Sequence, residues 1–331
     1  MATRPADTHT LRSALREMSM LRYIANRLFW FVPTLLVITL LTFLILQATP
    51  GSGVISSGAQ IINQDVVDQL EAEYGLDQPL YRQFFNYIVN VVQGDFGTSF
   101  VYRPQSVGNI IERTFPISLQ LGVYATVLAV TVGMALGVVS ALHQNGPLDY
   151  FSVILAVIFY SLPNFVMGFV LILAFVVYLP RAGIELGFNV GGLQSWQDWI
   201  LPTVALAATP LATIARFTRS SVIEVLQSDY VRVARAKGLR ENKVVTRHVL
   251  KNALIPIVTL IGPIFAAVAT GSFFVEAVFN IPGMGRYYVE SFVAKDQPMI
   301  LAVTLIYAVI LAGMNVLVDV LYGVIDPRIR Y

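Results

Sequence analysis

The chain has no cysteine and only three histidines among its 331 residues. Without cysteine it can form no disulfide and no thiolate metal site. His9, His143 and His248 lie far apart, and none stands beside carboxylates at a metal-ligand spacing. No glycine-rich strand-to-helix loop that could cradle a phosphate is present either. The sequence therefore predicts no catalytic residues, no metal site and no cofactor or nucleotide site on this chain.

Charged residues are also scarce. They make up 13% of the chain, whereas hydrophobic residues make up 56%, and the mean hydropathy is +0.68. Soluble domains carry roughly 25% charged residues. A net charge of +2 is too small to indicate a nucleic-acid partner. The composition therefore predicts an integral membrane protein in contact with lipid.

Long apolar runs recur along the chain, and a helix needs about 20 such residues to cross a bilayer. The first run is too long for the core of a signal peptide and lacks a persuasive cleavage site, so we expect it to stay as an anchor. No internal repeat is visible. The sequence predicts an all-α protein with six transmembrane helices, at roughly 28–48, 117–142, 151–179, 200–218, 253–275 and 299–323.

Basic residues flank both ends of the membrane region. Lysine and arginine are enriched in cytoplasmic loops, so both termini (1–27 and 324–331) are predicted to be cytoplasmic. An even number of spans agrees with that placement. The arginines that carry the argument are Arg12, Arg16, Arg22, Arg27, Arg328 and Arg330.

The segment 49–115, between the first two spans, is acidic and is predicted to lie outside. Apolar residues at helical spacing predict two short amphipathic helices, one over 66–74 and one over 80–91, followed by a turn at Gly94. These helices either cap the membrane domain or form part of a platform for an external protein.

Polar residues and proline in the apolar runs mark candidates for a hinge or a pathway. Pro163 is expected to kink the third span beside Asn164. Glu276 ends the fifth span, where it could pin the outer loop through Arg286. In the sixth span the candidates are Asn315 and Asp319, which share one helix face; for Asp319 an ion pair or helix cap is the simpler role.

The loop 220–251 carries the most distinctive pattern. Over 229–251 there are seven cations against two acids, so the segment is expected on the cytoplasmic side. Gly238 can adopt the left-handed conformation that ends one short helix before another begins at Arg240. The small residues Ala234 and Ala236 would keep one side of the first helix thin enough to enter a groove on a partner.

The phrase SSVIEVLQSDYVRVARAKGL, residues 220–239, resembles the EAA loop of ABC-importer permeases, and in particular the dipeptide/oligopeptide branch, B-subunit type. Two departures from the wider family fit that branch: Arg232 stands where many importers have glutamate, and the following proline is delayed to Pro256. Further matching phrases cover most of the chain after about residue 20: GLDQP at 75–79, GDFGTS at 94–99, SLPNF at 161–165, FNIPGMGR at 279–286 and DPRIR at 326–330.

The resemblance implies a type I ABC importer permease in a bacterial or archaeal cell membrane, with a five-helix core over 116–323. It implies a second homologous permease, two ATPase subunits that hold ATP and magnesium, and an extracytoplasmic substrate-binding protein. The residues expected to couple this chain to the ATPases are Tyr230, Ala234, Arg235, Ala236, Gly238 and Leu239.

The substrate implied is a di- or oligopeptide, while nickel, glutathione or an oligosaccharide remain open on the same architecture. A secondary transporter would be expected to show inverted repeats and ionisable residues in the membrane centre. A membrane enzyme would need converging nucleophile, base or metal ligands. The sequence supports both alternatives less well than an ABC-importer permease.

Overall fold

The computed structural model describes residues 8–49, 75–102, 104–269 and 273–325, and the regular structure within them is helical apart from one isolated bridge between Thr98 and Ser106. The predicted amphipathic helix over 66–74 lies outside the described residues. The α-helices are α1 (Thr8–Ala48), α4 (Leu80–Val92), α5 (Val107–Leu142), α6 (Pro147–Ser161), α7 (Asn164–Ile172), α8 (Leu179–Arg181), α9 (Ile200–Leu226), α10 (Asp229–Ala236), α11 (Glu241–Val244), α12 (Leu250–Ala253), α13 (Ile255–Ala269), α14 (Phe273–Val278), α15 (Met284–Ala294) and α16 (Gln297–Ile325). Two π-helical segments, Leu173–Tyr178 and Val245–Val249, and a 3₁₀ turn, Trp196–Trp199, complete the described helical elements.

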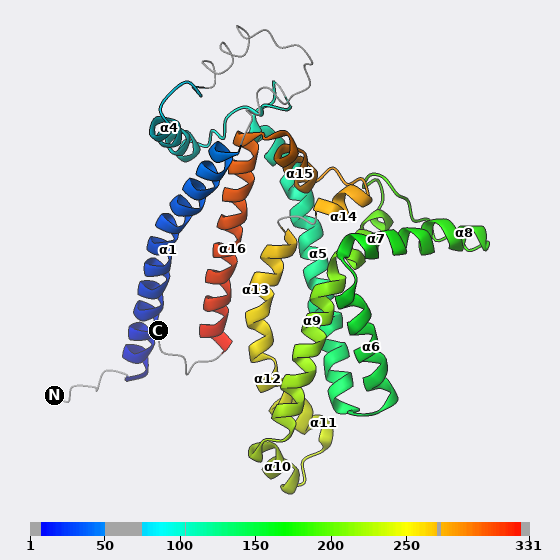
Figure 1. The fold of residues 1–331 in the computed structure, drawn as a ribbon. Coiled ribbons are helices and arrows are strands. Elements are labelled where there is room, and N and C mark those ends of the chain that lie inside the picture. The colour runs from blue at the N-terminus through cyan, green and yellow to red at the C-terminus, as the bar shows by residue number, and fades with distance from the viewer. Residues whose placement is uncertain (1–7, 50–74, 103, 270–272, 326–331) are drawn as a thin grey trace, which may run out of the picture.

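Five helices of the described segments are long and apolar enough to cross a bilayer, and a sixth is gained if the pair Glu241–Ala253 and Ile255–Ala269, bent by 49°, counts as one span. That number agrees with the predicted six. In Figure 1, α5 and α9 run along the centre of the bundle, and α1 lies beside α16 at one side. The described structure is thus an all-α membrane protein.

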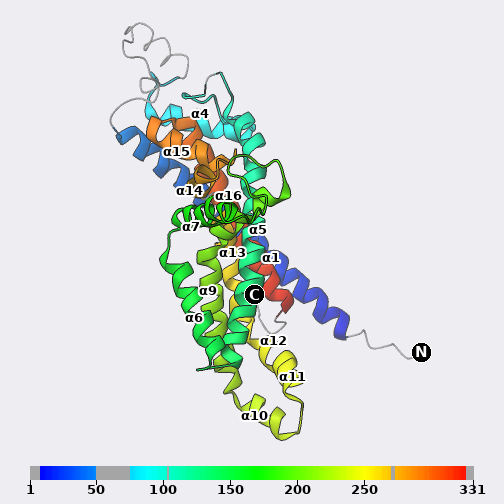
Figure 2. The same ribbon diagram turned by 90° about the vertical axis from the view of Figure 1, so that its right-hand side faces the viewer.

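The third predicted span, 151–179, is not one helix. Helix α6 ends at Ser161, Leu162 is extended (φ −92°, ψ 126°), and α7 begins at Asn164 after Pro163. The prediction of a kinked single helix was therefore wrong. Proline disfavours helical geometry at the residue before it and offers no N–H, which allows either a kink or a break, and here the helix breaks. Beyond the break, α7 and α8 run across the direction of α6 and α9 (Figures 1 and 2).

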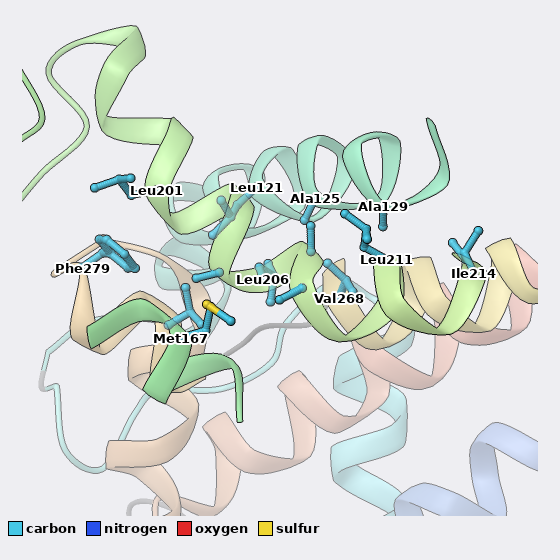
Figure 3. Close-up of a cluster of buried hydrophobic side chains, with 14 of the residues drawn as sticks. Leu121, Ala125, Ala129, Met167, Leu201, Leu206, Leu211, Ile214, Val268 and Phe279 are labelled. Atoms are coloured by element: carbon cyan, nitrogen blue, oxygen red, sulfur yellow. The ribbon is translucent and has the colours of Figure 1, made fainter. Parts of the chain in front are cut away.

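Close contact between α5 and α9 forms the centre of the fold. A Cβ at Gly137 would lie 2.5 Å from the Ala215 carbonyl oxygen, and one at Gly133 would lie 2.8 Å from that of Leu211. Glycine at these positions lets the two backbones approach, which is how helices pack tightly in lipid. The buried apolar cluster around this contact draws its side chains from α5, α7, α9, α13 and α14 and from Phe279 just after α14 (Figure 3).

The outer segment is fastened to the helix ends by buried polar contacts. Helix α4 forms where the sequence predicted an amphipathic helix, and Gly94 follows it with a positive φ of 84°. The fully buried Asp296 accepts hydrogen bonds from the Ser99 hydroxyl and from the backbone N–H of Phe100 at 3.1 Å. A buried carboxylate needs such partners, so Asp296 holds the loop before α5 against the start of α16.

Candidate functional site

The predicted coupling residues lie on residues 229–253, which we call the inner module: α10, α11, the second π-helical segment and α12. It projects from the end of the bundle opposite α4 and α15 (Figures 1 and 2). Its apolar side chains, with those of α5 and α9, form one buried cluster that includes Ala141, Val222, Val231, Ala234, Val244, Val249 and Ala253. The inner module is therefore packed on the bundle as a folded unit.

Helix α10 has one buried face and one open face. Val231 and Ala234 are buried against the bundle, whereas Tyr230 and Val233 are 44% and 51% exposed. Ala236 is exposed as well. Ala234, expected to keep one side of this helix thin, packs with its side chain against the bundle. The open face of α10 carries Tyr230, Val233 and Arg235, which are available to a partner.

Gly238 has a φ of +75°, as the sequence predicted for the end of the first short helix. Its N–H donates to the Arg235 carbonyl oxygen at 2.9 Å, and α11 follows with Arg240 as the residue before it. No atom lies within 4 Å of where a Cβ would be. Glycine is thus required by the backbone conformation and not by crowding within this chain. Leu239, the next residue, is half-buried and packs on the inner-module cluster.

An ion pair closes the turn around Gly238. Arg235 Nη2 lies 2.6 Å from Glu241 Oε1, and its Nε donates to Oε2 at 3.1 Å. The hydrogen bond from Arg235 lowers the pKa of the Glu241 carboxyl below its ordinary value, since donors stabilise the charged form. Both side chains are exposed, so the pair shapes the loop more than it stabilises the fold.

One hydrogen bond ties the inner module to α9, and a second joins α12 to α10 within the module. The Ser221 hydroxyl of α9 donates to the Ala253 carbonyl oxygen at 2.8 Å, and Asn252 Nδ2 donates to the Tyr230 hydroxyl at 3.0 Å. A displacement of α10 would therefore be passed to both α9 and α12. Immediately after Ala253, the chain bends by 49° between α12 and α13.

Pro163 and Asn164 line a cavity of about 520 Å³ between α7, α9, α13 and α14. The cavity is mostly apolar, with Phe165 and Phe274 in aromatic contact at 5.5 Å. Its polar groups are few: Thr209 Oγ1 donates to Asn164 Oδ1 at 2.7 Å, and Thr213 stands one turn further along α9. Apolar walls with a few placed polar groups are typical of small-molecule sites.

Glu276 lies apart from that cavity. It is 1% exposed and accepts a hydrogen bond from the Gly285 N–H at 2.8 Å and another from Ser118. Glu276 also accepts from the backbone N–H of Arg286, so the expected link to that residue is made by its backbone, while its guanidinium pairs with Glu290 at 2.7 Å. Through these backbone N–H groups Glu276 holds the loop between α14 and α15, which is a structural role.

The remaining two candidates are on α16. Asn315 is half-buried in this helix, and position 319 is also helical. The two positions are therefore one helical turn apart along the backbone, as predicted. The side chain of Asp319 lies outside what the structure describes. Asn315 does not line the cavity at Asn164.

The sequence reasoning missed an ion pair at the inner end of the bundle. Asp149, at the start of α6, is 5% exposed and pairs with Arg219 of α9 at 2.8 Å. The sequence could have indicated this ion pair, because both charges stand at the ends of neighbouring apolar runs. In the described part of the chain, no group of three histidine, cysteine or acidic residues could hold a metal ion.

Comparison with protein families matches two profiles in succession. Residues 20–122 match the N-terminal part of the binding-protein-dependent transport system membrane component, and residues 133–331 match the binding-protein-dependent transport system inner membrane component.

Among curated proteins, the chain is 44% identical to the dipeptide transport system permease protein DppB of Bacillus subtilis, over 94% of this chain and 98% of that protein. It is 39% identical to the oligopeptide transport system permease protein OppB of Haemophilus influenzae, over 94% of this chain and all of that protein. The glutathione transport system permease protein GsiC of Escherichia coli K12 is 42% identical, with the same coverage.

Solved structures agree on the fold. The inward-facing MetNI methionine ABC transporter matches with a TM-score of 0.53 at 18% identity, covering 66% of this chain and 96% of that one. An amino acid ABC transporter matches with a TM-score of 0.50 at 16% identity, covering 64% and 92%. At these identities the likeness concerns the arrangement of the helices.

Proposed function

Because the chain belongs to the family of binding-protein-dependent transport system inner membrane components, we propose that it is one half of the membrane pathway through which an ATP-driven importer takes up di- or oligopeptides. The observation that supports the substrate class is the similarity, over nearly the whole chain, to relatives named as dipeptide and oligopeptide permeases. The chain is a transport subunit and not an enzyme.

The partners follow from the inner module and from the open cavity. Two ATPase subunits hold ATP and magnesium, and the one that serves this chain docks on the open face of α10, at Tyr230, Arg235, Ala236 and the Gly238 turn. A second, homologous permease closes the groove at Asn164 and Thr209. A binding protein delivers the substrate to the outer end.

Closure of the ATPases would displace α10, and the displacement would reach α9 through the Ser221–Ala253 hydrogen bond and the shared apolar cluster. Such a movement shifts the helices between two arrangements, one open to each side of the membrane. The break at Pro163 and the bend after α12 are the places where helices can turn without losing internal hydrogen bonds.

Uptake of radiolabelled dialanine tests this proposal. In the native host, deletion of this chain should abolish uptake that depends on its own transport system, and the wild-type gene should restore it. Unchanged dialanine uptake in the deletion strain, with all other peptide systems removed, would contradict the peptide assignment.

Glutathione is a second candidate substrate, because a glutathione permease is 42% identical over 94% of this chain. A competition experiment distinguishes peptides from glutathione as the substrate. Excess unlabelled glutathione should leave dialanine uptake unchanged if peptides are the substrate. If glutathione is the substrate, uptake of labelled glutathione should instead depend on this chain and resist excess dialanine.

A further inference from the structure

Helix α9 presents a single open face over its central part, and that face is polar. From Ala205 to Arg216 every side chain is buried except Thr209, Thr213 and Arg216. Spacings of four and three residues place all three on one side of the helix. No other side of this stretch is open to the surroundings of the chain.

A helix that faces lipid shows the opposite pattern. The exposed side chains of α1 in the membrane are mostly leucine, isoleucine and valine, as at Val37, Leu41 and Ile45. A cation turned to lipid is costly, and ionisable residues within membrane helices generally face protein or water. The polar face of α9 therefore lines a surface that lipid does not cover.

The three residues of this face connect two cavities. Thr209 and Thr213 line the cavity at Asn164, whereas Arg216 lines a second cavity of about 250 Å³ between α5, α6 and α9. Along α9, the distance from Thr209 to Arg216 is about 10 Å. An extended peptide of two or three residues spans about 7–10 Å, so it can reach from one cavity to the other.

Among the residues that the structure describes, Arg216 has no acidic partner. The ion pairs formed among the described residues join other groups, including the neighbouring Arg219 with Asp149. The guanidinium carbon of Arg216 lies instead 4.5 Å from the centroid of the Tyr160 ring. Such a contact positions the cation, and within the described part of the chain the guanidinium forms no hydrogen bond or ion pair that would occupy its N–H donors.

We propose that Arg216 is a specificity-determining residue that binds the carboxylate of the substrate as it passes along the polar face of α9. Guanidinium and carboxylate form two parallel charge-assisted hydrogen bonds, and every unmodified peptide carries a C-terminal carboxylate. Thr209, Thr213 and Asn164 then face the amide groups of the same peptide. This inference rests on the proposed function, because it names the part of the peptide that the permease contacts.

The test is binding to the purified complex of this chain with its partner subunits, without nucleotide and without the binding protein. The probes are radiolabelled trialanine and trialanine with a C-terminal amide, measured by equilibrium dialysis. Wild type should bind the acid at least about tenfold more tightly than the amide, since a charge-assisted hydrogen bond is worth that factor or more. Arg216→Gln should bind both forms with the affinity that wild type has for the amide.

Two further variants separate this role from a structural one. Arg216→Lys keeps the charge and should keep most of the preference for the acid, even if Arg216→Gln proves unstable. Arg181→Gln removes one cation at the tip of α8, away from α9 (Figure 1), and should leave the preference unchanged.

Three outcomes would overturn the inference. The first is equal affinity of the wild type for the acid and the amide, and the second is no saturable binding of trialanine by the wild type at millimolar concentration. The third is that Arg216→Gln and Arg216→Lys both lose affinity for the acid and for the amide to the same extent. In each case dialanine uptake by wild-type cells would still support the proposed function. Absence of that uptake would contradict the proposed function itself.

Discussion

Asp149 and Arg219 form a two-point ion pair that joins the α5–α6 turn to α9. Arg219 Nε lies 2.8 Å from Asp149 Oδ1, and Nη2 lies 2.8 Å from Oδ2. The Ser140 hydroxyl and the Asn145 N–H donate to the same carboxylate. Each carboxylate oxygen therefore accepts two hydrogen bonds, and the two helices are held about three turns before the inner module begins.

Removal of one partner should destabilise the protein. Arg219→Ala leaves the buried Asp149 carboxylate without its counter-charge, which we expect to cost about 2–4 kcal/mol. Thermal unfolding of the purified chain in detergent should show a clearly lower midpoint. The double variant Asp149→Asn, Arg219→Gln should recover part of the loss because no unpaired charge remains. A double variant less stable than the sum of the single variants would contradict a direct pair.

Gly137→Leu should prevent α5 from packing on α9. Even the Cβ would lie 2.5 Å from the Ala215 carbonyl oxygen and 2.6 Å from Thr218 Cβ, so the helices must separate. We expect severe loss of the folded protein from the membrane, measured by quantitative blotting after detergent extraction. Gly313→Leu is the matched control, because a Cβ there meets nothing within 4 Å in α16. Equal abundance of both variants would contradict the packing argument.

Gly238→Val should uncouple transport without removing the chain from the membrane. A β-branched residue at a φ of +75° costs about 1–3 kcal/mol. That strain falls on the inner module and not on the spans. At matched membrane abundance we expect loss of dialanine uptake and weaker recovery of the ATPases on pull-down. Gly238→Asn should retain more uptake, because asparagine tolerates the left-handed region. Dialanine uptake at the wild-type rate by the valine variant would show that Gly238 is not part of the coupling contact.

The orientation of the chain can be measured with single cysteines, since the native sequence has none. Gln93→Cys, after α4, and Lys237→Cys, in the inner module, are both at exposed positions. An impermeant maleimide applied to intact cells should label the first and not the second, because basic loops remain cytoplasmic. Permeabilised cells should show labelling of both. The reverse pattern in intact cells would place the inner module outside and refute the coupling proposal.

The properties that depend on local composition could be predicted from the sequence. Six apolar runs, the amphipathic helix at Leu80–Val92 and the left-handed Gly238 all follow from residue type and spacing within short segments. Likewise, the basic inner module stands out because charge is scarce elsewhere. The phrases that resemble peptide permeases supplied the family before any geometry was known.

Which residues meet was decided by the tertiary structure. Whether Pro163 bends a helix or separates two depends on the contacts that α7 finds after the break. The pairing of Asp149 with Arg219 joins residues seventy positions apart. The polar face of α9 is a feature only because, from Ala205 to Arg216, the other sides of that helix are buried by α5, α6, α7 and α13. Sequence spacing places Thr209, Thr213 and Arg216 on one side, but burial of everything around them is what makes that side the open one, and burial is a property of the packed chain.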